Sequence, residues 1–426
     1  MAWFKEKQST HIVTGIDIGS TSIRIAVGEV TQSGHQQTIQ LLGAVEVPSV
    51  GVQRGIVTSI EESVSALSSG LEQIERIIGT PVERAWVGLT GAHIIAQSQR
   101  GVVAVARQNG EIGAEDVVRA VEAAKAIAPP LNYEMIHILP RRFTVDGQVG
   151  VTDPIGMTGI RLEVDTHIIH GLTTHLKNIT KAVYRTGIEI NDLVLSILAT
   201  ASIVTTPKQK DLGVAVVNIG GTTTSLVVYE EGEVLHIATI PIGSEHITND
   251  IAIGLRTNIE IAEQVKIHYG DALAKHVSKR EKIDLTTVGS DVSEEVSRHF
   301  VAQIIEARVS ELFEKIDAAL VSIHRKRMLP AGIVFTGGGA KLDGLVEAAK
   351  EMLELPASLG YPIDVVSVSD KVHDVSFSTA IGLVYWGAHM DVVPTTHVSL
   401  RQLAPSSSAL RAVADHIKKF MKALVP

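Results

Sequence analysis

The chain has 426 residues, of which 45% are hydrophobic and 20% charged, so it can build a packed core over more than one subdomain. A net charge of -9 argues against nucleic acid as the main partner, because phosphate binding relies on an excess of Lys and Arg. The absence of cysteine excludes disulfides, thiolate metal sites and thiol nucleophiles, and it fits a reducing cytoplasm.

The N-terminal part reads as an α/β domain without a signal sequence. Residues 1–7 (MAWFKEK) contain no apolar segment and lead directly into a strand, a glycine turn and a second strand at 12–29. A strand at 40–47 and a helix at about 60–78 follow, with Pro81 behind the helix.

Residues 84–171 differ from the segments around them in their pattern of predicted strands and helices. A helix over 113–126 is expected to end before Pro129 and Pro130. Alternating apolar residues predict strands on both sides of it, at 85–89, 101–106, 134–145 and 160–169. The block is therefore interpreted as a compact inserted α+β module.

The longest apolar stretch, residues 193–204, is interrupted by Ser196, Thr200 and Ser202. It is shorter than the roughly 20 residues that cross a bilayer, so the chain is not expected to span a membrane.

The second half of the chain repeats the strand, glycine turn and strand pattern of the first half. Residues 213–229 again read as strand, glycine turn and strand, and the strings IDIGST at 16–21 and VNIGGT at 217–222 correspond to one another. A mostly helical stretch, 247–327, separates this hairpin from a third glycine run at 337–339. An internal repeat of this kind predicts a duplicated domain with a ligand held between its halves.

Turns built from Gly, Ser and Thr can hold phosphate groups. Glycine allows close approach of the backbone N–H groups, and the hydroxyls add donors. The carboxylate of Asp17 beside the first turn could orient water on a phosphate-bound Mg²⁺. The alternative is that these segments are simply tight hairpin turns.

The order of these motifs resembles the actin/DnaK/sugar-kinase superfamily and, within it, the bacterial cell-division family FtsA. Residues 15–29 resemble the first phosphate motif, 216–229 the second, and 332–345 (GIVFTGGGAKLDGL) the adenosine motif. The segments 193–204 and 377–387 resemble the two helices that connect the lobes. The block 84–171, with VGLTG at 87–91 and PIGMTG at 154–159, resembles the subdomain inserted in FtsA.

The fold that this resemblance implies is α/β: an actin-like (ribonuclease H-like) duplicated two-lobe fold with an inserted α+β subdomain and a C-terminal amphipathic helix. The implied domains are a first lobe at 11–83, to which 172–200 and 372–390 return, the inserted subdomain at 84–171, a second lobe at 201–246 with 328–371, its helical subdomain at 247–327, a linker at 391–408 and a membrane-targeting helix at 409–426.

The implied cofactors are ATP and Mg²⁺, with Asp17 holding the metal through water. Glu263 and Lys266 match the family's ribose-binding pair, and their spacing places them on one helical face. The expected nucleotide-binding residues are Asp17, Gly19, Ser20, Thr21, Arg24, Asn218, Gly220, Gly221, Thr222, Thr223, Glu263, Lys266, Gly337, Gly338, Gly339 and Lys341.

Two positions depart from the family pattern. Asn218 and Ser225 stand where the second phosphate motif usually has Asp, while Arg24 replaces a Lys and keeps a positive charge. An amide supplies no negative charge for a metal shell, and no convincing general base is found among the motif residues, so no catalytic residue is assigned. The expectation is nucleotide binding with slow or absent hydrolysis.

The C-terminal residues 409–426 (ALRAVADHIKKFMKALVP) predict an amphipathic helix behind a Pro- and Ser-containing linker. Its bulky apolar face and lysine-rich opposite face are typical of a helix lying on an anionic membrane surface. The alternative is a terminal helix packed on the chain's own core. The expected membrane-binding residues are Leu410, Val413, Ile417, Lys418, Lys419, Phe420, Met421, Lys422 and Leu424.

The resemblance implies a polymerising, ATP-binding division protein at the cytoplasmic face of the cell membrane. It would contact the tubulin-like protein FtsZ through the helical subdomain and tether it to the membrane through the C-terminal amphipathic helix. It would also associate with itself into filaments and contact later division proteins through the inserted module. Three alternatives share the fold: a PilM-like pilus-assembly protein, a sugar or acetate kinase, and a DnaK-like chaperone. The kinase would need a catalytic carboxylate, and the chaperone would need a further substrate-binding domain.

Overall fold

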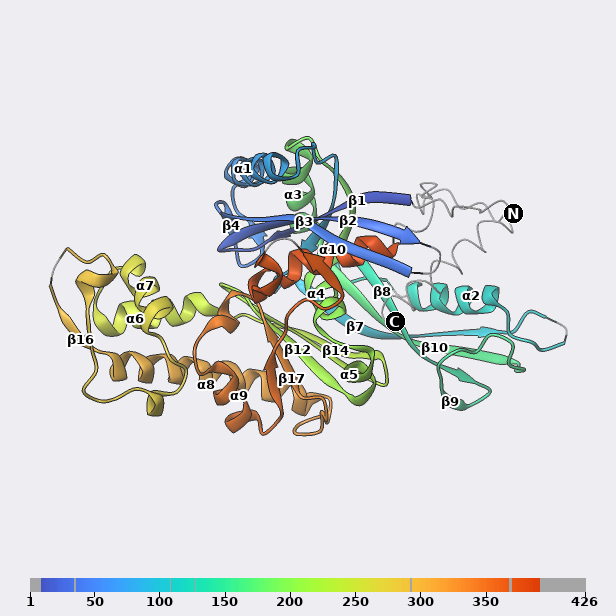
Figure 1. The fold of residues 1–426 in the computed structure, drawn as a ribbon. Coiled ribbons are helices and arrows are strands. Elements are labelled where there is room, and N and C mark those ends of the chain that lie inside the picture. Colours follow the sequence, from blue (N-terminus) through green and yellow to red (C-terminus); the bar gives the residue numbers. More distant parts are fainter. Residues whose placement is uncertain are drawn as a thin grey trace, which may run out of the picture.

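The computed structural model describes residues 9–390 apart from 34–35, 108, 127, 292 and 368–369. Two lobes face each other, with the inserted module to one side and a helical part to the other (Figure 1). The predicted linker at 391–408 and the predicted amphipathic helix at 409–426 lie outside the described residues.

The first lobe is built on a six-stranded sheet in the order β11-β6-β1-β2-β3-β19. Neighbours among β1, β2 and β3 are antiparallel, whereas β6, β11 and β19 join in parallel. The strands are β1 (Ser9–Ile18), β2 (Ser22–Ser33), β3 (Gln36–Pro48), β6 (Arg84–Leu89), β11 (Glu189–Leu195) and β19 (Val365–Ser367), with a small hairpin of β4 (Val52–Gln53) and β5 (Ile56–Val57).

Helices cover both faces of this sheet. Because successive strand residues point to opposite faces, Ile23 and Ile25 pack under α1 (Ile60–Ile78) and α3 (Thr173–Arg185), which lie side by side (Figure 1). Ala26 points the other way, toward α4 (Ser196–Val204) and α10 (Ser378–Met390).

The helix predicted at 60–78 forms α1 with these bounds because both of its ends carry caps. The Ser59 side chain accepts a hydrogen bond from the Glu62 N–H at the N-terminus, and Gly79 closes the C-terminus with φ 75°.

The inserted module has its own four-stranded sheet, in the order β7-β10-β8-β9, with α2 (Ala114–Lys125) packed on it. Its strands are β7 (Ile94–Ala104), β8 (Tyr133–Val145), β9 (Gln148–Val151) and β10 (Arg161–Leu172). The predicted strand at 101–106 is thus wrong in its bounds, since β7 begins at Ile94. One face of β7 is exposed, and residues 97–100 (QSQR) are polar. A search for apolar residues therefore missed the first part of this strand.

The second lobe carries a five-stranded sheet in the order β14-β13-β12-β17-β18. Its strands are β12 (Val214–Ile219), β13 (Thr224–Glu230), β14 (Glu233–Ile240), β17 (Ile333–Thr336) and β18 (Ala357–Leu359). Its helices are α5 (Pro207–Leu212), α6 (Ser244–Leu255), α7 (Ile259–Tyr269), α8 (Arg298–Ser322) and α9 (Leu345–Leu353), beside a hairpin of β15 (Lys282–Asp284) and β16 (Glu295–Ser297). Single 3₁₀ turns are η1 (Ala274–His276), η2 (Leu285–Val288), η3 (Gly338–Lys341), η4 (Asp370–His373) and η5 (Val375–Phe377).

The helices α4 and α10 run between the lobes and are almost wholly buried. They pack closely, because a Cβ added at Gly382 would lie 2.3 Å from the carbonyl oxygen of Ala199. A helix that is apolar on all sides is expected in such a position. Within residues 9–390, no described helix combines the length and apolar content that a membrane span requires.

Candidate functional site

A cavity of about 500 Å³ lies between the two lobes, and we call it the interlobe cavity. The chain segments that surround it come from all three glycine-rich turns and from the helix that carries Glu263 and Lys266. The structure therefore brings together every nucleotide-binding residue predicted from the sequence: Asp17, Gly19, Ser20, Thr21, Arg24, Asn218, Gly220, Gly221, Thr222, Thr223, Glu263, Lys266, Gly337, Gly338, Gly339 and Lys341.

The first turn joins β1 to β2 and places a buried carboxyl beside a cation. Asp17 is opposite Arg24 in the strand register and is 9% exposed. Burial raises the pKa of the Asp17 carboxyl to about 6, and the positive charge of Arg24 lowers it in part. Arg24 itself pairs with Glu46 at 2.7 Å. A cation or a hydrogen-bond donor beside Asp17 would therefore stabilise its ionised form.

The second turn joins β12 to β13 and is tied to the helix α10. The Asn218 Nδ2 group donates to the Thr379 hydroxyl at 2.9 Å, and the same hydroxyl bonds the Thr200 hydroxyl at 2.9 Å. The Asn218 Oδ1 atom faces Gly337, where an added Cβ would approach it to 2.3 Å. Asn218 thus joins the second turn, α10 and the third glycine run.

The tips of the first two turns touch across the cavity. The Ser20 and Thr222 hydroxyls form a hydrogen bond of 2.9 Å, and Thr21 donates to the Glu245 carboxylate at 2.9 Å. A Cβ at Gly221 would lie 1.9 Å from the Thr21 hydroxyl, so this approach requires glycine.

Glu263 and Lys266 form an ion pair on α7, with Glu263 Oε2 2.6 Å from Lys266 Nζ. Lys266 also donates to the Thr248 hydroxyl at 2.9 Å and to the Ser244 carbonyl at 3.3 Å. These contacts fix the side chain over the cavity and leave Glu263 Oε1 for a further donor, such as a hydroxyl.

The third glycine run follows β17 and lies over the second turn. Gly337 has φ 88°, and a Cβ at Gly339 would lie 2.4 Å from the Ile219 side chain. Lys341 pairs with Asp374 at 2.7 Å. The run thus forms a close-packed wall that presents backbone rather than side chains.

Sequence reasoning missed several polar residues at or beside the cavity, among them Ser196, Thr379 and Glu245. Ser196 and Thr379 lie at the first turns of the interlobe helices and line the cavity. The Ser196 hydroxyl is buried without a hydrogen-bond partner among the described residues, and it lies 2.6 Å from the point where a Gly88 Cβ would stand. Ser196 and Thr379 belong to the segments 193–204 and 377–387 that resemble the family's connecting helices, but the sequence assigned them no role, since their contacts join segments distant along the chain.

The donor set can be compared with what a nucleotide and Mg²⁺ require. Backbone N–H groups and hydroxyls from two turns, with Arg24 nearby, suit phosphate oxygens. Within the described ranges, no group of three or more His, Asp or Glu side chains is placed to hold a metal ion. A divalent ion here would rely on Asp17, water and the phosphates, as Mg²⁺ often does.

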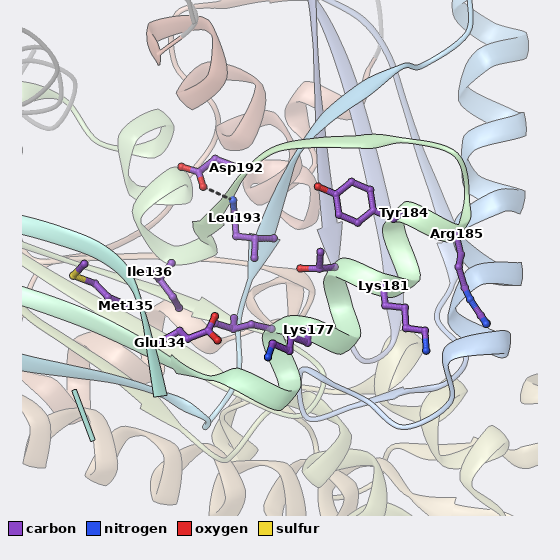
Figure 2. A pocket seen from close by; sticks show the side chains of 11 residues that line it. Glu134, Met135, Ile136, Lys177, Lys181, Tyr184, Arg185, Asp192 and Leu193 are labelled. Carbon is purple, nitrogen blue, oxygen red and sulfur yellow. Dashed lines mark hydrogen bonds between the residues drawn. The ribbon is translucent and has the colours of Figure 1, made fainter. Parts of the chain in front are cut away.

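A second cavity, of about 690 Å³, opens where the inserted module meets the first lobe, and we call it the module groove. It lies between β8, α3 and β11 (Figure 2). Its lining residues are Glu134, Met135, Ile136, Leu176, Lys177, Thr180, Lys181, Tyr184, Arg185, Asp192 and Leu193.

The comparisons with known proteins point to one family. The family model described as "Cell division protein FtsA" matches residues 215–382, and "SHS2 domain inserted in FTSA" matches residues 91–170. FtsA of Pseudomonas aeruginosa is 37% identical over 380 residues, which cover 89% of this chain and 90% of that protein. This chain belongs to the FtsA family of cell-division proteins. FtsA of Bacillus subtilis is 36% identical over 88% of this chain and 83% of its own length. Membership of this family supports a role of this chain in cell division.

Solved structures confirm the predicted actin-like fold. The "PilM-PilN type IV pilus biogenesis complex" matches with a TM-score of 0.63 at 18% identity, covering 88% of this chain and 98% of that one. The ethanolamine utilization protein EutJ from Carboxydothermus hydrogenoformans matches with a TM-score of 0.51 at 15% identity, covering 88% and 89%. These likenesses concern the fold alone, whereas the FtsA relatives match in sequence. Family membership therefore decides against the pilus-assembly, kinase and chaperone alternatives.

Proposed function

We propose that this FtsA-family chain binds ATP in the interlobe cavity, assembles into filaments and holds FtsZ at the cytoplasmic face of the cell membrane at the division site. The observation that carries the nucleotide part is the convergence of all the predicted binding residues on one cavity.

In this proposal the first two turns hold the phosphates, Glu263 and Lys266 hold the ribose, and the third glycine run with Lys341 holds the adenosine side. Asp17 holds Mg²⁺ through water. The hydroxyls and backbone groups that line the cavity support these roles, because they can supply donors for an anionic ligand.

The site is proposed to bind ATP but to hydrolyse it slowly. Asn218 brings no charge and its amide is already engaged with Thr379, while Ser225 replaces the second expected carboxylate. Of the other carboxylates that line the cavity, Glu46 and Glu263 are held in ion pairs, and Asp343 follows the third glycine run on the proposed adenosine side. A water-activating base beside the phosphates would then have to be Asp17, which the metal also needs.

The nucleotide part is tested by equilibrium dialysis of the full chain with ATP and Mg²⁺, followed by a turnover assay on the same preparation. We expect saturable binding of about one ATP per chain and fewer than about one turnover per second, at the low end of enzyme rates. No saturable binding would contradict the nucleotide site, and several turnovers per second would contradict slow hydrolysis.

Contact with FtsZ is proposed for the helical part formed by α6, α7 and α8. Ile253 on α6 is 77% exposed and Phe300 on α8 is 45% exposed. The helices α6 and α8 approach each other here, because an added Cβ at Gly254, the residue after Ile253, would stand 4.0 Å from the Phe300 ring. Exposed apolar side chains that cluster in this way support a protein-binding surface.

Recruitment of later division proteins is proposed for the module groove. Its floor is apolar, through residues such as Ile136 and Leu193, while Lys177 and Lys181 stand exposed along its helical wall (Figure 2). Neither lysine has an ion-pair partner among the described residues, unlike Arg185, which pairs with Glu61. A segment with apolar anchors and acidic residues would suit this surface.

A further inference from the structure

One buried histidine of the inserted module contacts the chain segment that borders the interlobe cavity. His137 lies on β8, next to the groove residues Glu134, Met135 and Ile136. Its Nε2 atom accepts a hydrogen bond of 3.0 Å from the Leu195 N–H, and the contact is buried. Because an amide donates to Nε2, the neutral ring carries its proton on Nδ1.

The donor in this bond stands at the junction of β11 with the helix α4. Leu195 is the last residue of β11 and the N-cap of α4. The next two residues, Ser196 and Ile197, line the interlobe cavity. On the other side, Asp192 and Leu193 of the same strand line the module groove. A few residues of one strand therefore separate the two cavities.

The same histidine contacts the second interlobe helix. Its ring centroid lies 6.0 Å from that of Trp386 on α10. The first turn of α10 carries Thr379, which lines the cavity and bonds Asn218. His137 thus touches both helices whose first turns face the interlobe cavity.

We propose that His137 links the interlobe cavity to the module groove, so that ATP in the cavity changes the groove. This inference rests on the proposed ATP binding. Phosphates held by both turns would replace the Ser20–Thr222 hydrogen bond. Because Asn218 of the second turn bonds Thr379 of α10, and Thr379 bonds Thr200 of α4, a shift of the turn would be passed to both helices. Through the Leu195 N–H and Trp386, a shift of these helices moves β8 and the groove wall that it forms.

Hydrogen–deuterium exchange of the full chain, with and without ATP and Mg²⁺, tests the link. We expect exchange in residues 133–138 and 173–185 to change by about five-fold or more, the lower end of coupling between linked sites. In His137→Phe, which keeps a ring but removes the acceptor, this change should be lost. In His137→Gln, whose side-chain oxygen reaches the position of Nε2, it should return.

A matched control is His167→Phe. His167 is also buried in the module and bonds a backbone carbonyl, that of Leu235, at 3.0 Å, but it contacts the second lobe instead of the interlobe helices. This variant should keep the ATP-dependent change in the groove.

The outcomes separate the link from the proposed function. ATP binding is measured by dialysis on the same samples. If the wild-type chain binds ATP and the groove exchange stays the same, the link is wrong while the nucleotide site stands; this comparison needs no variant to fold. If His137→Phe binds ATP and keeps the full change, the role of His137 is wrong. If the wild-type chain binds no ATP, both proposals are overturned.

Discussion

Asn218 shows how one side chain can serve structure at a position where the family usually has a carboxylate. Its amide donates to Thr379, which an ionised carboxylate could not do, and its oxygen lies against Gly337. The sequence predicted the loss of a metal-orienting charge at this position. It could not reveal the bond to Thr379, because the two residues are separated by most of the second lobe.

Asp17 is the residue whose titration can be tested directly. Its pKa is raised to about 6 from an ordinary value of 3.8, mainly by burial. The folded chain therefore holds this proton more tightly than the unfolded chain, and the buried charge destabilises the ligand-free protein above pH 6. This loss of folding stability disappears as the pH falls from about 6 toward 4, because the Asp17 carboxyl is then protonated in the folded chain.

We expect Asp17→Asn to raise the free energy of unfolding of the ligand-free chain at pH 7.5, by up to about 3 kcal/mol. The difference from the wild type should shrink as the pH falls through 6, as measured by urea unfolding at several pH values. The same variant should bind ATP without the dependence on Mg²⁺ that we expect of the wild type. An equal or lower stability of the variant at pH 7.5 would contradict the claim that the buried, ionised Asp17 destabilises the ligand-free chain.

At the scale of elements, the apolar pattern predicted most strands, because their inner faces are buried, whereas the interlobe helices were expected only from the resemblance of 193–204 and 377–387 to the family's connecting helices. It was wrong about the start of β7, where one face meets solvent and residues 97–100 are all polar. The module groove was not predicted at all. Its walls come from β8, α3 and β11, and only the folded chain brings these elements together.

The surface of α6 and α8 gives the first prediction at this scale. Ile253→Glu places a charge in the exposed apolar cluster and should weaken FtsZ binding by about ten-fold or more, the effect of losing roughly 1.4 kcal/mol at an interface. A pull-down or titration with purified FtsZ measures the change. Ile77→Glu on α1 is the control, since Ile77 is 57% exposed in the first lobe, and it should bind as the wild type does. Equal loss in both variants would argue against this surface.

The amphipathic segment 409–426, which lies outside the described residues, gives the second prediction at the scale of elements. Removal of these residues, or Phe420→Glu alone, should abolish co-sedimentation with anionic liposomes, because one short helix binds weakly and depends on its apolar face. Phe420→Leu keeps the apolar face and should retain binding. Unchanged co-sedimentation of the deletion would count against membrane attachment through this segment.

At the scale of the whole molecule, the repeated turn strings predicted two similar halves around a ligand, and the structure places both turns at one cavity. The contact of the turns through Ser20 and Thr222, and that of Thr21 with Glu245 on α6, could not be predicted. They depend on how closely the lobes approach, which no local pattern encodes. The short path through His137 was hidden for the same reason.

Weak attachment by single helices becomes firm when many copies align on one surface, so filament formation and membrane binding should reinforce each other. Electron microscopy of the purified full chain on anionic lipid monolayers, with and without ATP and FtsZ, tests this claim most directly. The account predicts membrane-bound filaments with ATP that recruit FtsZ to the lipid. A bare monolayer under all these conditions would contradict it.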